Sequence, residues 1–185
     1  MEGKAFLVRF TTDWTCGLLW NKLYKRALFD GIFFEEGHKI DDEYFTYQGV
    51  MNAAKVVCDP RVVYNYRQRA SSVMQSPAAR AQIAVDRIDF MAKRREKVLE
   101  RFPELRREFD ISFVDALSYL ADYPDNTEES IRLLKYYARR YFLQRGNTFP
   151  PRYLLKAVCL MYVTSTEKLL KRPQAKKPSP EDYYA

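Results

Sequence analysis

Apolar residues recur at helical spacing through the second half of the chain. From residue 84 to residue 102 they follow one another at intervals of three, four and seven positions, which predicts one long amphipathic helix with a charged opposite face. Shorter helices are expected over residues 112–121, from residue 126 or 127, and from residue 150 to about 170. Residues 77–170 are therefore predicted to form an all-helical bundle, and the proline-rich residues 171–185 a disordered tail.

Residues 1–76 mix helical and strand-like patterns. A short helix is expected near the start, and a second helix over residues 42–54 with Asp41 as its N-cap. Two short apolar runs, residues 32–34 and 62–66, are rich in branched and aromatic side chains and predict β-strands. We therefore expect an α+β fold that is predominantly helical, in which an incomplete mixed sheet is backed by one or two helices. An open sheet of this kind exposes edges and apolar surface, so self-association is also expected.

Charge and cysteine content narrow the classes of function only slightly. The chain has 185 residues and a net charge of +7, from 31 basic and 24 acidic side chains, which favours anionic partners such as diphosphates, anionic lipid headgroups or nucleic acid. Its three cysteines and single histidine lack the spacing of a metal or redox site. No apolar run approaches the roughly 20 residues that span a bilayer, and no signal peptide opens the sequence. These features predict a cytoplasmic protein with reduced thiols.

An acidic triplet, Asp41-Asp42-Glu43, opens the helix expected over residues 42–54. About twenty-five residues later, the second strand-like run is followed by Arg67 and Arg69. Carboxylates at the start of a helix and guanidinium groups after a strand can face one another across a site. Acids in a first turn also stabilise a helix by capping it and by meeting the positive end of its dipole. The pattern alone leaves both interpretations open.

The chain has a more specific likeness in three segments: WNKLYKRALF (residues 20–29), DDEYFTY (41–47) and YNYRQRASSVM (64–74). In this order and spacing they resemble the second half of the catalytic domain of bacterial family 2 glycosyltransferases, which have a nucleotide-diphospho-sugar transferase (GT-A) fold. The resemblance covers residues 3–76 and continues loosely into the helical segment. The nucleotide-binding first half of that family and its Asp-x-Asp metal motif have no counterpart in the sequence. The resemblance therefore implies the C-terminal portion of such an enzyme, with residues 1–76 as the acceptor-side half of a GT-A-like catalytic domain that is incomplete alone.

The resemblance also implies roles for individual residues. Asp42 matches the catalytic base of the family, and Asp41 stands where the family has a glutamate. Arg69 matches a loop that closes over the donor diphosphate, and Arg67 and Ser72 lie in the same loop. Guanidinium groups suit this role because they bind phosphate oxygens bidentately. A solvated basic loop is the alternative for Arg69, and a structural role is the alternative for Arg67.

On the acceptor side, the resemblance points to Lys22, Asp41 and Glu43. Glu43 is equally consistent with a solvent-exposed acid in the first turn of a helix, and His38 carries no assigned role. A divalent metal, Mn²⁺ or Mg²⁺, is expected for the complete enzyme, although no residue of this chain is assigned as its ligand. The expected partners are a nucleotide-diphospho-sugar donor and a glycan or lipid-linked acceptor.

Two other functions are compatible with the sequence. The nine basic residues between Arg80 and Arg107 favour peripheral contact with the inner face of the plasma membrane, so a basic helical binding module without catalysis is one alternative. Nucleic acid is not the expected partner, because aromatic side chains are not interleaved with the basic run. The other alternative is a structural or regulatory fragment that has lost its chemistry and retains only a helical interaction surface.

Overall fold

The described part of the computed structural model is helical. It comprises residues 1–62, 64–67, 69, 72, 76–121, 126–142 and 149–162. Its α-helices are α1 (Gly3–Arg9), α2 (Asp41–Met51), α3 (Pro77–Arg101), α4 (Arg106–Ala121), α5 (Glu128–Phe142) and α6 (Pro151–Tyr162). Its 3-10 helices are η1 (Trp14–Gly17), η2 (Arg26–Phe29) and η4 (Pro103–Leu105).

The expected α+β fold, with an incomplete GT-A-type sheet, is wrong for these residues. The runs predicted as strands, residues 32–34 and the described part of 62–66, are coil. A β-strand is stable only when its N–H and C=O groups pair with a neighbouring strand. Among the described residues, the only such pairing outside helices is an isolated antiparallel bridge between Glu2 and Lys55. The described part of the second run therefore lacks a partner strand, and Val62 and Tyr64 are exposed.

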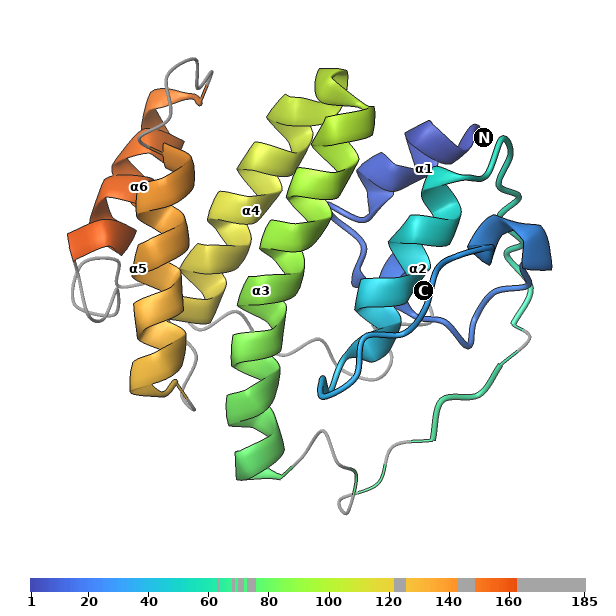
Figure 1. Cartoon of the computed structure of the whole chain (residues 1–185), viewed down its shortest axis with the longest axis horizontal. Coiled ribbons are helices and arrows are strands. Elements are labelled where there is room, and N and C mark those ends of the chain that lie inside the picture. The colour runs from blue at the N-terminus through green and yellow to red at the C-terminus, as the bar shows by residue number, and fades with distance from the viewer. Residues whose placement is uncertain are drawn as a thin grey trace.

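The long helix α3 lies at the centre of the molecule, as Figure 1 shows. Its start combines the hydroxyl of Ser76, which accepts a hydrogen bond from the N–H of Ala79 at 3.1 Å, with Pro77 in the first turn. These are favourable positions for both residues at the beginning of a helix. The prediction of one long amphipathic helix in this region is confirmed.

On one side of α3, a first hydrophobic cluster joins α1, α2 and the loops between them. Helix α2 begins at Asp41, close to the predicted start. A glycine in its third turn, Gly49, lies against the ring of Phe29 in η2, and a Cβ atom at Gly49 would be 2.2 Å from a ring carbon. This close approach fixes the loop before α2 against the body of the helix.

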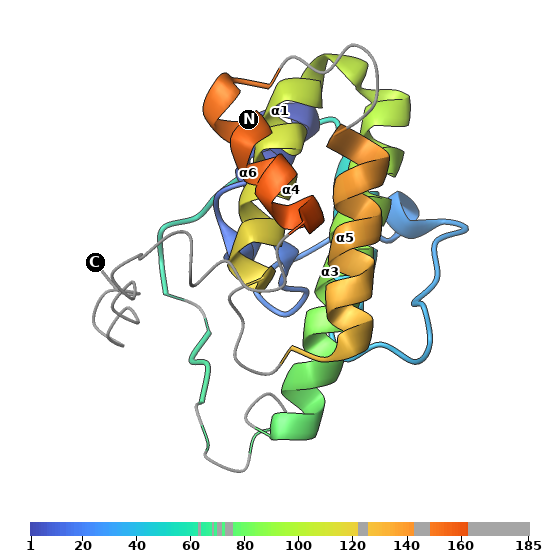
Figure 2. The same ribbon diagram turned by 90° about the vertical axis from the view of Figure 1, so that its left-hand side faces the viewer.

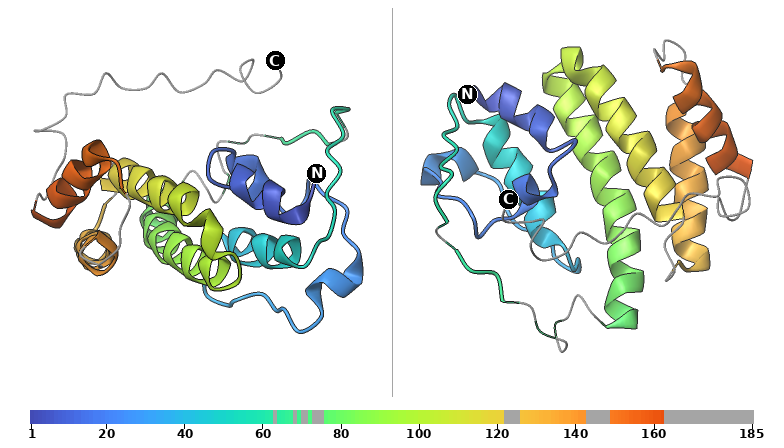
Figure 3. Two further views of the ribbon diagram at one scale, coloured as in Figure 1. Left: turned by 90° about the horizontal axis from the view of Figure 1, so that it is seen from above. Right: turned by 180° about the vertical axis from the view of Figure 1, so that it is seen from behind.

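On the other side of α3, a second cluster joins α4, α5 and α6. These helices lie where helices were predicted, with α4 starting earlier than expected, at Arg106. Figures 2 and 3 show that α5 and α6 form one end of the molecule. Residues 163–170 of the last predicted helix and the predicted tail over residues 171–185 lie outside the described residues. None of the described helices combines the length and the apolar character needed to cross a bilayer.

Candidate functional site

The first turn of α2 holds the predicted catalytic carboxylate in a defined position. Asp42 is half-buried, and its carboxylate accepts hydrogen bonds from the backbone N–H groups of Glu43, at 3.0 Å, and Leu19. Asp41 is exposed, and its carboxylate accepts from the N–H of Asp42 at 3.1 Å. Burial raises the pKa of Asp42 above that of an ordinary aspartate, and the charge of Asp41 adds to this, against the opposing effect of the N–H donors. The result is a carboxylate with more affinity for a proton than usual.

Lys22 lies in the loop that faces this carboxylate. Its ammonium group donates to the carbonyl oxygens of Thr15, at 3.0 Å, and Leu18, at 2.6 Å, and to the side-chain oxygen of Asn21 at 2.6 Å. Burial lowers the pKa of Lys22 to about 8, although nearby acidic groups, Asp42 among them, oppose the shift. Lys22 therefore holds the loop of residues 15–22 together beside Asp42, and its nitrogen is already engaged by three oxygen atoms.

Glu43 turns toward the body of the protein rather than toward solvent. Burial raises the pKa of its carboxyl group, while Arg87 and Arg94 of α3 favour the charged form. Its Cγ lies so close to η1 that a Cβ atom at Gly17 would be 3.1 Å away. Glu43 is therefore half-buried against η1 rather than fully exposed.

The first and third segments of the family resemblance are in contact. The ring of Trp20 stacks on the ring of Tyr66, with centroids 5.1 Å apart and an angle of 7° between the planes. It also packs on Tyr64, with centroids 4.4 Å apart. Trp20 is nevertheless partly exposed, with 38% of its surface open to solvent. Its stacking brings the segment before Arg67 next to the loop that bonds Asp42.

The structure does not join the predicted phosphate-binding loop to Asp42 directly. Arg67 and Arg69 are exposed, and the N–H of Ser72 donates to the carbonyl oxygen of Arg69 at 3.0 Å, a local turn. Within the part of the chain that is described, no hydrogen bond or ion pair links Asp42 to either arginine. The role of Arg67, Arg69 and Ser72 in donor binding stays a prediction.

Sequence reasoning missed a second polar cluster, which lies between α2 and α3. Asp86 is 1% exposed, and its carboxylate is 3.2 Å from Nδ1 of His38 and accepts from the N–H of Lys39 at 2.6 Å. The ring of His38 stacks on Tyr44, with centroids 4.2 Å apart, and the Tyr44 hydroxyl donates to the Asp86 carbonyl oxygen at 2.8 Å. These contacts anchor the loop before α2, and with it the first turn that carries Asp42.

A sequence signal for the buried charges exists in the pattern of α3. Asp86 and Arg94 fall in the same helical stripe as Ile83 and Phe90, at intervals of three and four residues. A charged residue at an apolar-face position of an amphipathic helix indicates a buried polar contact. Asp86 meets this expectation through His38 and Lys39, whereas Arg94 is 6% exposed and its guanidinium lies 4.6 Å from the centroid of the Phe90 ring. The partners of Asp86 come from a distant segment, so the pattern could not name them.

The residues present do not fit a metal site by themselves. No group of three or more His, Cys, Asp or Glu side chains in the described segments is arranged to hold an ion.

Comparison with known proteins adds no assignment. No family model matches the chain, no curated protein is similar to it, and no solved structure matches its fold. The functional argument therefore depends on the three motif segments and on the geometry around Asp42.

Proposed function

We propose that residues 1–76 form the acceptor-side half of an inverting sugar transferase, with Asp42 as the general base. One observation carries the proposal: the first of the three segments that resemble family 2 glycosyltransferases contacts each of the other two, through Phe29 on Phe45 and through Trp20 on Tyr66. The N–H of Leu19 bonds the Asp42 carboxylate, and Trp20, the next residue, stacks on Tyr64 and Tyr66. The loop that bonds the Asp42 carboxylate is thus also the loop on which the third segment stacks.

The proposed reaction needs a carboxylate of raised basicity. The acceptor hydroxyl loses its proton to Asp42 as its oxygen attacks the anomeric carbon of the donor sugar, and the bond from that carbon to the diphosphate oxygen breaks. A base is more effective when its pKa lies closer to the working pH, and burial shifts the pKa of Asp42 in that direction. The nucleoside diphosphate leaves with the bonding electron pair.

The charge on the leaving diphosphate requires cations. Arg67 and Arg69 are exposed, and neither forms an ion pair with a carboxylate that the structure describes. Guanidinium groups in this state are available to bind phosphate oxygens in pairs. In this proposal Arg69 contacts the diphosphate, and Arg67 and Ser72 support the loop.

Exposed apolar side chains in residues 1–76 are a second reason to propose a donor-binding partner. Coil residues in the same half of the chain expose large apolar side chains, with exposed fractions of 103% for Leu23, 80% for Phe33, 79% for Val57 and 73% for Val62. Large apolar side chains with this much exposed area are suited to being covered by another structural unit. We infer that a donor-binding half packs here and completes the active site.

The direct test measures sugar transfer by the chain combined with a donor-binding half. That half is either encoded in frame with the chain or co-expressed as a separate subunit. A panel of uridine- and guanosine-diphosphate sugars is offered with a bacterial lipid and glycan extract as the acceptor source. The proposal predicts acceptor-dependent release of nucleoside diphosphate from at least one donor, and loss of that release in Arg69→Gln. Release that is independent of Arg69 and of added acceptor would contradict it.

A further inference from the structure

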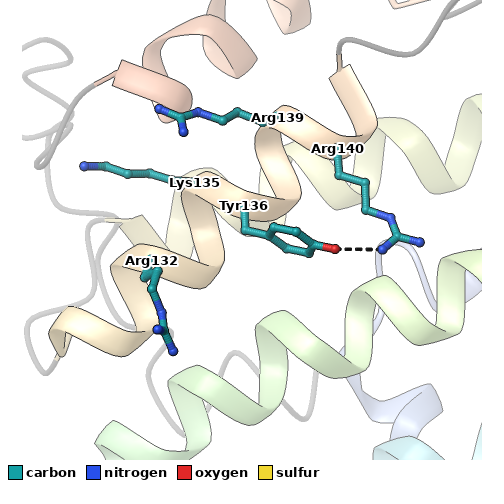
Figure 4. A pocket seen from close by; sticks show the side chains of 5 residues that line it. All are labelled: Arg132, Lys135, Tyr136, Arg139 and Arg140. Atoms are coloured by element: carbon teal, nitrogen blue, oxygen red, sulfur yellow. Dashed lines mark hydrogen bonds between the residues drawn. The ribbon is translucent and has the colours of Figure 1, made fainter.

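Helix α5 carries a row of cations with little compensation from acids. Its basic face consists of Arg132, Lys135, Arg139 and Arg140, which together with Tyr136 line a hollow of about 480 Å³ (Figure 4). Arg140 is partly neutralised, because it lies 3.1 Å from Glu96 and donates to the Tyr136 hydroxyl at 2.8 Å. The other three cations form no ion pair with an acidic side chain in the described segments. This face therefore holds several positive charges ready for an anionic partner.

The neighbouring helix α6 exposes a row of apolar side chains. Its apolar stripe, with 41% to 75% of each side chain exposed, consists of Leu154, Leu155, Val158 and Tyr162. The opposite face of α6 is buried against α4 and α5. A helix that is apolar on its solvent side as well as its core side has a second surface to cover.

The two faces belong to the same end of the molecule. Figures 1 and 3 show α5 and α6 side by side at that end, beyond α3 and α4. The C-terminal end of α6 lies beside the middle of α5, on the side toward which Lys135 and Arg139 extend (Figures 2 and 4). The two helices contain six basic and two acidic side chains. Positive charge and exposed apolar surface thus occur together.

We propose that the basic face of α5 and the apolar stripe of α6 form a docking surface for an anionic lipid bilayer. The cations lie at the level of the headgroups, and the leucine side chains enter the boundary with the acyl chains. Long basic side chains and tyrosines suit this boundary, because each has an apolar stem or ring and a polar end. A soluble anion would engage the cations but leave the apolar stripe in water, whereas a bilayer covers both without matching the shape of a pocket.

This surface differs from the one that the sequence indicated. The basic residues between Arg80 and Arg107 favoured membrane contact, but Arg94 and Arg95 of that run are buried in the structure. The inference does not depend on the proposed transfer reaction, so either can fail without the other.

The test is flotation of the full chain with vesicles of phosphatidylcholine, alone or mixed with phosphatidylglycerol. We expect binding to the mixed vesicles that weakens at high salt, and little binding to the neutral ones. Lys135→Gln/Arg139→Gln should lower the partition coefficient on mixed vesicles by roughly 30-fold, because each basic residue near the surface contributes attraction. Leu154→Ser/Leu155→Ser should lower it by at least roughly tenfold, because apolar area no longer leaves water.

Matched controls separate this surface from general charge and hydrophobicity. Arg26→Gln/Lys55→Gln removes the same charge from segments at the opposite end of the molecule (Figure 1), and Leu23→Ser removes a leucine that is more exposed than Leu154 or Leu155. Both should leave vesicle binding nearly unchanged, and circular dichroism should show native helix content in every variant. Equal binding to neutral vesicles, equal losses in the controls or no binding at all would overturn the proposal. So would a leucine variant that changes only the oligomeric state, because the stripe would then be covered by a second copy.

Discussion

Asp42 combines two features that raise the pKa of a carboxyl group, removal from water and a second carboxylate beside it. Burial is the larger effect, and the exposed Asp41 adds to it. The N–H groups of Leu19 and Glu43 act in the opposite direction and keep the carboxylate oriented. The position is therefore suited to accept a proton and is held by backbone that does not titrate.

A first prediction concerns the pH dependence of transfer. A general base acts in its ionised form, so activity should rise with pH through the pKa of Asp42, which lies above the ordinary aspartate value of 3.8. Replacing Asp41 with Asn removes a negative charge that disfavours the Asp42 carboxylate, so the rising limb should move to lower pH. The measurement is kcat/KM against pH for both proteins. An unchanged limb, or a shift to higher pH, would show that Asp41 does not act on the base.

Lys22 offers a prediction that does not require activity. In Lys22→Met, the carbonyl groups of Thr15 and Leu18 and the amide oxygen of Asn21 lose a half-buried donor. The free energy of unfolding should fall by about 1–3 kcal/mol, measured by urea denaturation. Lys25→Met, at an exposed position, should change it by about 0.5 kcal/mol or less. Equal effects of the two substitutions would mean that Lys22 does not hold the loop.

The helices were more predictable than the rest of the fold because their periodicity is local. The stripe of α3 and the charges at both ends of α5 can be recognised from neighbouring residues alone. The predicted strand over residues 62–66 failed because a strand also needs a partner, which the pattern of one segment cannot supply. The acids at the start of α2 were predictable as first-turn residues. The electrostatic effect of Arg94 on Glu43 and the contact of His38 with Asp86 depend on long-range packing and could not be predicted.

The packing of α3 against α4 and α5 centres on a buried ion pair. Nε of Arg95 donates to the carboxylate of Asp110 in α4 at 2.6 Å, and the guanidinium lies 4.5 Å from the centroid of the Tyr141 ring in α5. Burial raises the pKa of Asp110, while Arg95 opposes the shift. One arginine thus contacts two neighbouring helices.

Asp110→Asn should therefore be costly, because it leaves the Arg95 charge buried without its partner. We expect a loss of about 3–5 kcal/mol in the free energy of unfolding, measured by chemical denaturation. Replacing both partners, as in Arg95→Met/Asp110→Leu, should recover most of it. Asp115→Asn removes a more exposed acid that pairs with Lys156 and should cost no more than about 1 kcal/mol. A small effect of Asp110→Asn would contradict the structural role of the pair.

The molecule as a whole has two different exposed surfaces. One half exposes apolar side chains on coil, with Leu23 and Phe33 the most exposed. The far end carries the basic face of α5 and the apolar stripe of α6. In the two proposals the first surface packs on a donor-binding half and the second docks on a bilayer, which would place the chain between them.

The isolated chain should therefore self-associate through its coil-bearing half. Light scattering should give a mass above that of the monomer that increases with concentration, and Leu23→Ser/Val57→Ser should lower it, because less apolar area is removed from water on association. A strict monomer at every concentration would contradict the inference that this half is a docking surface.

The role of Asp42 is tested most directly by the turnover of Asp42→Asn in the chain combined with its donor-binding half. Asparagine keeps the size of the side chain but cannot accept the proton, so turnover should fall by roughly 100-fold to 10,000-fold. Binding of the nucleotide-sugar, measured by calorimetry, should be unchanged, and Asp41→Asn should retain turnover within roughly tenfold. Ordinary turnover in Asp42→Asn would contradict the assignment of the base, and with it the proposed function of this half of the chain.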